Sequence, residues 1–183
     1  MAALRHLEAH AAEYHLNLGS CFPTGDSAGA LLCLFALSLN SSEMLQQAFG
    51  ISGTGIPFRA AGLIFIMLDT QRRDLLCAIR NVVTDRNDRG KPYEKNLLDP
   101  ALLVGDAGLP SLFLVTSAED LIRRDTLKFD RLLTERHVEH SLLDFPKGVK
   151  GRKLVHVFSV MYPMYPESRD VFKKMNRYFQ EVL

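Results

Sequence analysis

Apolar residues in this chain gather in continuous runs, a pattern typical of strands and helices that are covered on more than one side. The run from Ala28 to Leu37 (AGALLCLFAL) is apolar on every face, as expected for a helix buried inside an α/β protein. The runs 62–68 and 111–116 are continuous rather than alternating, which indicates strands covered on both faces of a parallel sheet. These three segments predict a sheet with helices on both sides.

Weaker patterns complete the predicted order of elements. Residues 2–14 read as an amphipathic helix, a short strand ends at Ser27, another strand covers residues 138–145, and Asp125 is predicted to cap the helix before it. A final helix begins near Ser168 and carries one apolar face, formed by Val171, Phe172, Met175, Tyr178, Phe179 and Val182. The polar, turn-rich segments 40–55 and 85–100 are predicted to be connections. Alternating strands and helices predict an α/β fold: a mostly parallel sheet flanked by helices in three layers.

Length and composition narrow the class of protein. The 183 residues, 47% of them hydrophobic, suffice for one domain over residues 1–183 with a sizeable core. The net charge of +1 gives no electrostatic reason to expect nucleic acid or an anionic membrane as a partner, so a small neutral substrate fits better. The three cysteines lack metal or disulfide spacing, and no apolar run approaches the roughly 20 residues of a membrane span. We therefore expect a cytoplasmic protein. The six histidines include close pairs but no third ligand, and no metal site is predicted.

The segment Gly25-Asp26-Ser27-Ala28-Gly29 is a G-x-S-x-G pentapeptide, placed where a short strand leads into the apolar helix. In a nucleophile elbow of this kind a sharp, strained turn exposes the serine hydroxyl at the start of a helix. Small residues flank the serine, and we expect that neither glycine leaves room for a larger side chain. The pentapeptide therefore makes Ser27 a candidate nucleophile.

Two further candidates follow at the ends of predicted strands. Asp120 stands just past the strand 111–116, and His156 lies in the loop beyond the strand 138–145. Ligands of open α/β sheets bind at the carboxyl ends of the strands, where these side chains would meet Ser27. The chain order serine, aspartate, histidine is that of α/β-hydrolases and differs from the orders of chymotrypsin and subtilisin.

Each candidate also has a plainer interpretation. Ser27 would cap the helix in a glycine turn, Asp120 would cap the element after its strand, and His156 would be a solvated loop histidine. Asp125 and Glu119 are rival carboxylates for the position beside the histidine. Residues 161–166 (MYPMYP) either line an acyl pocket or pack their loop onto the last helix.

The chain resembles the hormone-sensitive-lipase-like branch of the α/β-hydrolase fold, the carboxylesterases and acetyl esterases. The resemblance is carried by the pentapeptide, by residues 109–116 (LPSLFLVT) with Glu119-Asp120, and by residues 156–158 with Tyr162-Pro163 and Glu167-Ser168. It implies that Ser27 is the nucleophile, that His156 is the general base and then the acid, and that Asp120 orients and stabilises the imidazolium. It also implies hydrolysis of small, short-acyl esters through an acyl-serine intermediate, with no metal or organic cofactor.

The chemistry requires these residue types. A serine hydroxyl is a poor nucleophile at neutral pH, so a histidine within hydrogen-bond reach must take its proton. A carboxylate on the other ring nitrogen fixes the tautomer of that histidine and favours its cation. The backbone N–H of Ala28 would donate to the oxyanion.

The chain departs from the resembled family before Ser27. No H-G-G-G sequence, the source of a second oxyanion donor, stands among the 26 residues that precede Ser27. We expect an N-terminally truncated hydrolase, the C-terminal half to two-thirds of the fold, that lacks the first strands. The strand before Ser27 would then be an open edge, which tolerates Pro23 and is a candidate surface for pairing with a second copy. The alternative function is a catalytically weak or inactive hydrolase fragment that needs a partner chain or the missing segment.

Overall fold

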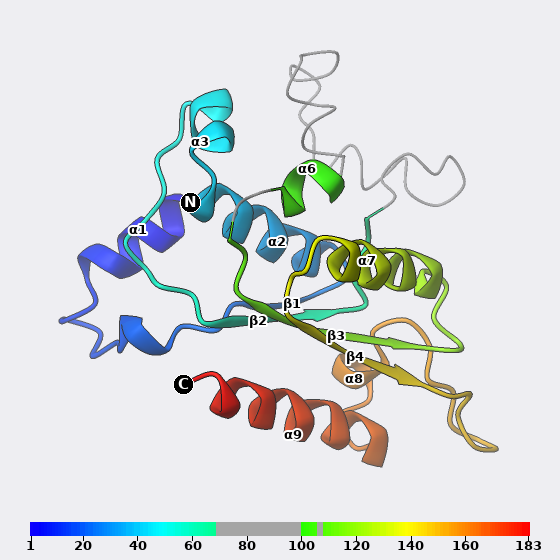
Figure 1. Cartoon of the computed structure of the whole chain (residues 1–183). Helices are drawn as coiled ribbons and strands as arrows, with labels where there is room; N and C mark the ends of the chain where they lie inside the picture. The colour runs from blue at the N-terminus through cyan, green and yellow to red at the C-terminus, as the bar shows by residue number, and fades with distance from the viewer. Residues whose placement is uncertain (69–99, 106–107) are drawn as a thin grey trace, which may run out of the picture.

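A four-stranded parallel sheet forms the centre of the structure, a computed structural model in which residues 1–68, 100–105 and 108–183 are described (Figure 1). Its strands lie side by side in chain order: β1 (Thr24–Asp26), β2 (Ala60–Ile64), β3 (Ser111–Ser117) and β4 (His140–Phe145). Each strand pairs in parallel with its neighbour. Parallel strands place all their carboxyl ends at one edge, so the segments that follow β1 and β3 end up near each other.

Helices cover both faces of the sheet. In chain order they are α1 (Ala2–Ala9), the 3₁₀ turn η1 (Leu18–Ser20), α2 (Ala28–Ser41), α3 (Glu43–Phe49), α6 (Pro100–Val104), α7 (Arg123–Glu135), α8 (Phe158–Met161) and α9 (Pro166–Glu181). Figure 1 shows α2, α6 and α7 above the sheet and α8 and α9 below it. The prediction of a parallel sheet between two helical layers is therefore confirmed.

The two faces of the sheet carry separate apolar clusters, and β3 contributes to both. Leu112 and Leu114 belong to the cluster shared with α2, α6 and α7, whereas Phe113 and Val115 belong to the cluster shared with α8 and α9. Because successive side chains of a strand point to opposite faces, a strand buried on both faces is apolar at successive positions, as β3 is from Leu112 to Val115. This requirement explains the continuous apolar run from which the strand was predicted.

Several predicted bounds differ from the observed elements. The amphipathic pattern of residues 2–14 is helical only as far as Ala9, and hydrogen-bonded turns follow. The apolar run 62–68 is strand only as far as Ile64, because Phe65 takes φ +51° while the next residues stay buried. The strand predicted over residues 138–145 begins at His140. Burial thus continues beyond the end of β2, whereas residues 12–14 after α1 are exposed.

The connection predicted over residues 40–55 contains a helix that the sequence analysis missed. The side chain of Ser42 accepts a hydrogen bond from the N–H of Leu45 (3.3 Å) and so caps α3, and Gly50 ends the helix at φ +60°. These are ordinary start and stop signals. Only Leu45 of this short helix is buried, which made the segment look like a polar loop.

The starts of the two long C-terminal helices also differ from expectation. Asp125 does not cap α7, because the helix begins at Arg123 and Asp125 lies buried in its first turn. The last helix begins at Pro166, two residues before the predicted start, with proline in its first turn. Phe172, assigned to its apolar face, is 42% exposed. The predicted surface excursion 85–100 falls outside the described residues as far as residue 99.

β1 lies at one edge of the sheet that the described residues form, and it pairs there with β2. Pro23 directly precedes the strand, and its carbonyl accepts a hydrogen bond from the N–H of Gly62 (3.0 Å). A proline has no backbone N–H to donate. Here only its carbonyl is needed on the side that faces β2, so no hydrogen bond of the sheet is lost. Pairing of this edge with a second copy stays a prediction.

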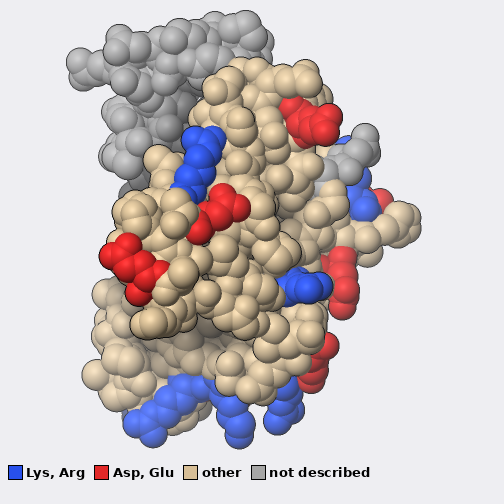
Figure 2. Space-filling view, turned by 90° about the vertical axis from the view of Figure 1, so that its left-hand side faces the viewer, with Lys and Arg blue, Asp and Glu red and all other residues tan. Residues whose placement is uncertain are grey.

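Uncharged residues cover most of the face shown in Figure 2, with basic and acidic side chains in small separate groups. Within the described ranges no single helix is long and apolar enough to cross a membrane. By length and composition α2 and α3 pass that test only together, as a pair bent by 105°.

Candidate active site

Ser27 occupies the sharp turn between β1 and α2. Its backbone lies at φ +54° and ψ −117°, a conformation that few non-glycine residues adopt and that costs about 1–3 kcal/mol. The N–H of Ser27 donates to the carbonyl of Ile64 at the end of β2 (2.9 Å), which ties the turn to the sheet. The hydroxyl makes no helix-capping hydrogen bond.

The two glycines of the pentapeptide have different roles. A Cβ on Gly25 would lie 2.4 Å from the backbone carbonyl group of Gly29, so only glycine allows the strand and the helix to approach this closely. A Cβ on Gly29 would meet no described atom within 4 Å. The expectation that neither position leaves room was therefore wrong for Gly29.

This difference predicts opposite outcomes for two alanine variants. Gly29→Ala will keep the fold and raise the melting temperature slightly, because alanine is favoured over glycine in a helix by about 1 kcal/mol. Gly25→Ala will lower the melting temperature strongly or prevent folding, because its Cβ would overlap backbone atoms. Thermal unfolding followed by circular dichroism measures both variants, and equal melting temperatures would contradict the predicted difference.

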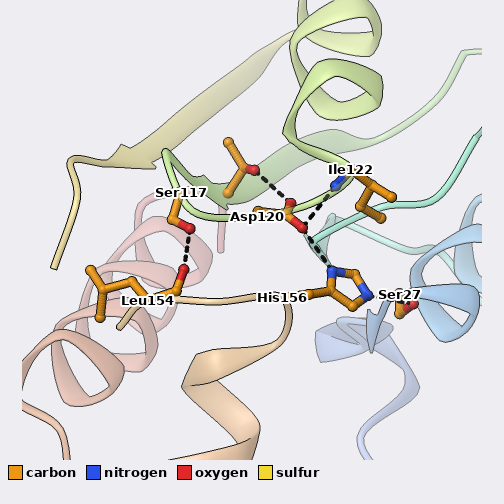
Figure 3. A network of polar contacts seen from close by, with 7 residues as sticks. Ser27, Ser117, Asp120, Ile122, Leu154 and His156 are labelled. Atoms are coloured by element: carbon orange, nitrogen blue, oxygen red, sulfur yellow. Dashed lines mark hydrogen bonds and ion pairs between the residues drawn. The ribbon is translucent and has the colours of Figure 1, made fainter. Parts of the chain in front are cut away.

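The structure brings Ser27, Asp120 and His156 together at the carboxyl edge of the sheet (Figure 3). The Oγ of Ser27 lies 2.9 Å from the Nε2 of His156, and the Nδ1 of His156 lies 2.9 Å from the Oδ1 of Asp120. With the proton on Nδ1, the ring donates to the carboxylate and accepts from the serine hydroxyl. This is the arrangement that a general base needs in order to activate serine.

Asp120 is held in place by donors of its own segment. The hydroxyl of Thr116 donates to Oδ2 (2.9 Å) and the backbone N–H of Ile122 donates to Oδ1 (3.1 Å). The side chain of Asp120 is fully buried, whereas that of His156 is 21% exposed. A buried carboxylate that keeps several hydrogen bonds stays oriented, and the imidazole remains accessible from one side.

The rival carboxylates lie elsewhere. Glu119 accepts hydrogen bonds from the backbone of the loop before His156, and Asp125 belongs to α7. Sequence reasoning named neither Thr116 nor Phe65 as part of the site. The ring of Phe65 meets the imidazole of His156 edge-on, with centroids 5.6 Å apart. Thr116 could have been found, because it is a hydroxyl residue four positions before Asp120. Phe65 could not, because the continuous apolar run 62–68 gave no sign that the strand ends at Ile64.

Ala28 is the first residue of α2, directly after the serine. The first N–H groups of a helix have no partner within the helix, so the N–H of Ala28 is placed to bind an anion beside Ser27. The side chain of Ala28 packs on the small cluster of Met67 and Ile122. Its role as an oxyanion donor stays a prediction.

The MYPMYP segment divides between packing and exposure. Tyr162 stacks on Tyr165 with centroids 4.9 Å apart, and both rings pack against the cluster that holds α9. Met161 and Met164 are 57% and 63% exposed. Of the two interpretations of this segment, an acyl pocket or packing onto the last helix, the tyrosines follow the second. In the described part of the chain, no group of three His, Cys, Asp or Glu side chains is placed to hold a metal ion.

Solved structures identify the architecture around this site. An esterase B from Lactobacillus rhamnosis superposes on 99% of the chain with a TM-score of 0.87 and 23% sequence identity. The chain has part of the α/β-hydrolase fold. A carboxylesterase from Lactobacillus plantarum covers 98% of the chain with a TM-score of 0.75 and 16% identity. A hyperthermophilic esterase from the archaeon Pyrobaculum calidifontis covers 99% with a TM-score of 0.65 and 15% identity.

The chain spans only part of each of these α/β-hydrolase structures: 58% of the esterase B, 65% of the carboxylesterase and 59% of the archaeal esterase. No family model matches the sequence, and no curated protein matches it either. At these identities the likeness establishes the fold, and the chemistry has to be argued from the site.

Proposed function

We propose that this chain is a serine hydrolase that cleaves small carboxylic esters through an acyl-serine intermediate. The observation that carries the proposal is the continuous line of hydrogen bonds from Ser27 through His156 to the buried Asp120. A helix-capping serine and a solvated histidine would have no reason to meet across 129 residues of sequence. The fold shared with esterases supports the same assignment.

In the acylation half-reaction, the Oγ of Ser27 attacks the ester carbonyl carbon while its proton passes to the Nε2 of His156. The imidazolium keeps its Nδ1–H on Asp120, and the carbonyl oxygen becomes an oxyanion beside the N–H of Ala28. Collapse of this tetrahedral intermediate breaks the bond to the alcohol oxygen, which leaves with the proton from Nε2. The acyl group remains on Ser27.

In the deacylation half-reaction, a water molecule gives a proton to the neutral His156 and attacks the acyl carbon. The second tetrahedral intermediate collapses, the proton on Nε2 returns to the Oγ of Ser27, and a carboxylic acid is released. No cofactor enters this sequence, because water and three side chains account for every proton and bond.

Short acyl chains are the proposed substrates. The esterase B with the same fold was solved with a tributyrin phosphonate inhibitor, and another esterase of the comparison was soaked with p-nitrophenyl butyrate.

Ala28 is the one oxyanion donor that we assign, and loss of one such donor costs about 10²–10³ in turnover. We therefore expect the 183-residue chain to hydrolyse p-nitrophenyl butyrate slowly.

A phosphonate probe tests the proposal even where turnover is slow, because a single attack labels the protein permanently. We expect a butyl fluorophosphonate to label the native chain once, at Ser27, and peptide mass spectrometry will locate the adduct. Heat-denatured protein is the control and should remain unlabelled, because an isolated serine hydroxyl is a poor nucleophile. Labelling at another serine, or none at Ser27, would rule the proposal out.

A further inference from the structure

The loop that carries His156 is fastened to the end of β3 by the two side chains on either side of Ala118. The hydroxyl of Ser117 donates to the carbonyl of Leu154, as Figure 3 shows. The Oε2 of Glu119 accepts hydrogen bonds from the N–H of Gly148 (2.9 Å) and from the N–H of Leu154 (2.8 Å). One carboxylate oxygen therefore joins both ends of the loop 148–154.

These contacts matter because the loop has little other regular structure. Glu119 and Val155 form an isolated parallel bridge, and His156 follows directly. Asp120, the neighbour of Glu119, binds the imidazole itself. Adjacent carboxylates thus act at two levels: Glu119 holds the backbone of the loop, and Asp120 orients the ring that the loop presents.

We propose that Glu119 is a positioning residue, whose carboxylate fixes the loop 148–154 so that His156 lies between Asp120 and Ser27. The proposal rests on the proposed function in that His156 is the general base. A displacement of about 1 Å in a catalytic group can cost 10²-fold in rate, so a side chain that never touches the substrate can still control turnover.

Gly148 supplies an independent reason to regard the contact as built into the fold. A Cβ on Gly148 would lie 2.0 Å from the carbonyl oxygen of Arg152 and 3.1 Å from the Oε2 of Glu119. Only glycine lets the chain turn this tightly while its N–H reaches the carboxylate. Gly148→Ala therefore disturbs the same contact from the loop side and leaves Glu119 in place.

The loop also favours the charged form of Glu119. Hydrogen bonds from the backbone of Leu154 and Gly148, followed by the nearby charges of Lys153 and Lys147, lower the pKa of Glu119 from its ordinary value. A carboxylate with a lowered pKa in the folded state stabilises the fold above its unfolded pKa. That contribution is lost as the pH falls through the lowered folded pKa.

This linkage predicts a pH-dependent difference between the wild type and Glu119→Gln. At pH 7 the wild type will have the higher melting temperature, because only the carboxylate is held by charge as well as by hydrogen bonds. As the pH falls below the ordinary range of glutamate, the two melting temperatures will converge. Differential scanning fluorimetry from pH 3 to pH 7 measures the difference, and a gap independent of pH would contradict the prediction.

Kinetics of four variants test the positioning role. Glu119→Ala and Gly148→Ala should lower kcat for p-nitrophenyl butyrate by about 10- to 100-fold while KM changes less than twofold, because proton transfer is impaired and binding is not. Glu119→Gln keeps one acceptor oxygen and should lose less. Glu135→Gln, at the exposed end of α7, is the matched control and should behave as wild type.

A second measurement reports on His156 without any substrate. In the wild type, ¹⁵N-edited NMR of the imidazole rings should show the Nδ1–H tautomer for His156, with the signal assigned through His156→Ala. Glu119→Ala should give mixed tautomers in protein that is still folded, a change that a general loss of stability would not produce. Glu119→Gln, which keeps the shape of the side chain, serves if the alanine variant does not fold.

The outcomes separate this proposal from the proposed function. Wild-type kcat and an unchanged His156 tautomer in both Glu119→Ala and Gly148→Ala would overturn the positioning role. If the wild type showed no Ser27-dependent hydrolysis, the proposed function would fail, and the tautomer of His156 would still decide whether Glu119 positions the ring.

Discussion

Ser27→Ala will remove almost all hydrolysis of p-nitrophenyl butyrate by the protein. Removal of the nucleophile from a serine hydrolase costs on the order of 10⁶-fold in kcat, the largest effect expected of any single substitution here. The acyl-serine cannot form without Oγ, and His156 then has no hydroxyl to activate. Initial rates at saturating ester, corrected for hydrolysis in buffer, measure the loss.

A serine at the far end of α2 provides the matched control. Ser41 lies at the opposite end of α2, where its hydroxyl donates to the carbonyl of Leu37 (3.1 Å). Ser41→Ala should hydrolyse the ester at the wild-type rate. Both variants should unfold near the wild-type temperature, because alanine can take the backbone of Ser27 at similar cost. If Ser27→Ala hydrolysed the ester at the wild-type rate, the activity would belong to another residue or to a contaminant.

The elements predicted best are those whose burial leaves a direct trace in the sequence. β3 is apolar from Leu112 to Val115 because Phe113 and Leu114 face different clusters, and its predicted start at Ser111 matches the structure. The apolar sequence of α2 likewise reflects its burial against the sheet, although Leu32 is 58% exposed. By contrast, α3 buries only Leu45, so its polar sequence gave no amphipathic signal, although Ser42 and Gly50 carried its boundaries.

The site shows where sequence reasoning stops. Ser27, Asp120 and His156 could be chosen because a strained turn, strand ends and chain order constrain them. The role of Glu119 could not, since it depends on where the fold places the backbone N–H groups of Gly148 and Leu154. The free space beside Gly29 depends likewise on how far neighbouring elements stand from the helix.

Asp120→Ala will lower kcat by about 10⁴-fold, the loss expected when a triad loses its carboxylate. His156 then has no acceptor at Nδ1, so the ring turns freely between tautomers and its cation is no longer stabilised. KM should change little, because Asp120 is buried behind the imidazole. Asp170→Asn, on the outer face of α9, is the control and should keep wild-type kinetics.

Asp120→Asn separates orientation from charge. The N–H of Ile122 donates to the same oxygen, Oδ1, that accepts from His156, so the amide oxygen of asparagine is favoured there and the amide nitrogen turns to Thr116. A hydroxyl accepts as well as donates, so Thr116 can accommodate that nitrogen. The Nδ1–H tautomer of His156 is then kept and only the negative charge is lost. We expect a smaller loss than in Asp120→Ala, because the tautomer that activates Ser27 is retained. Equal losses in the two variants would show that the amide had flipped and that the Ile122 donor does not control the orientation of this side chain.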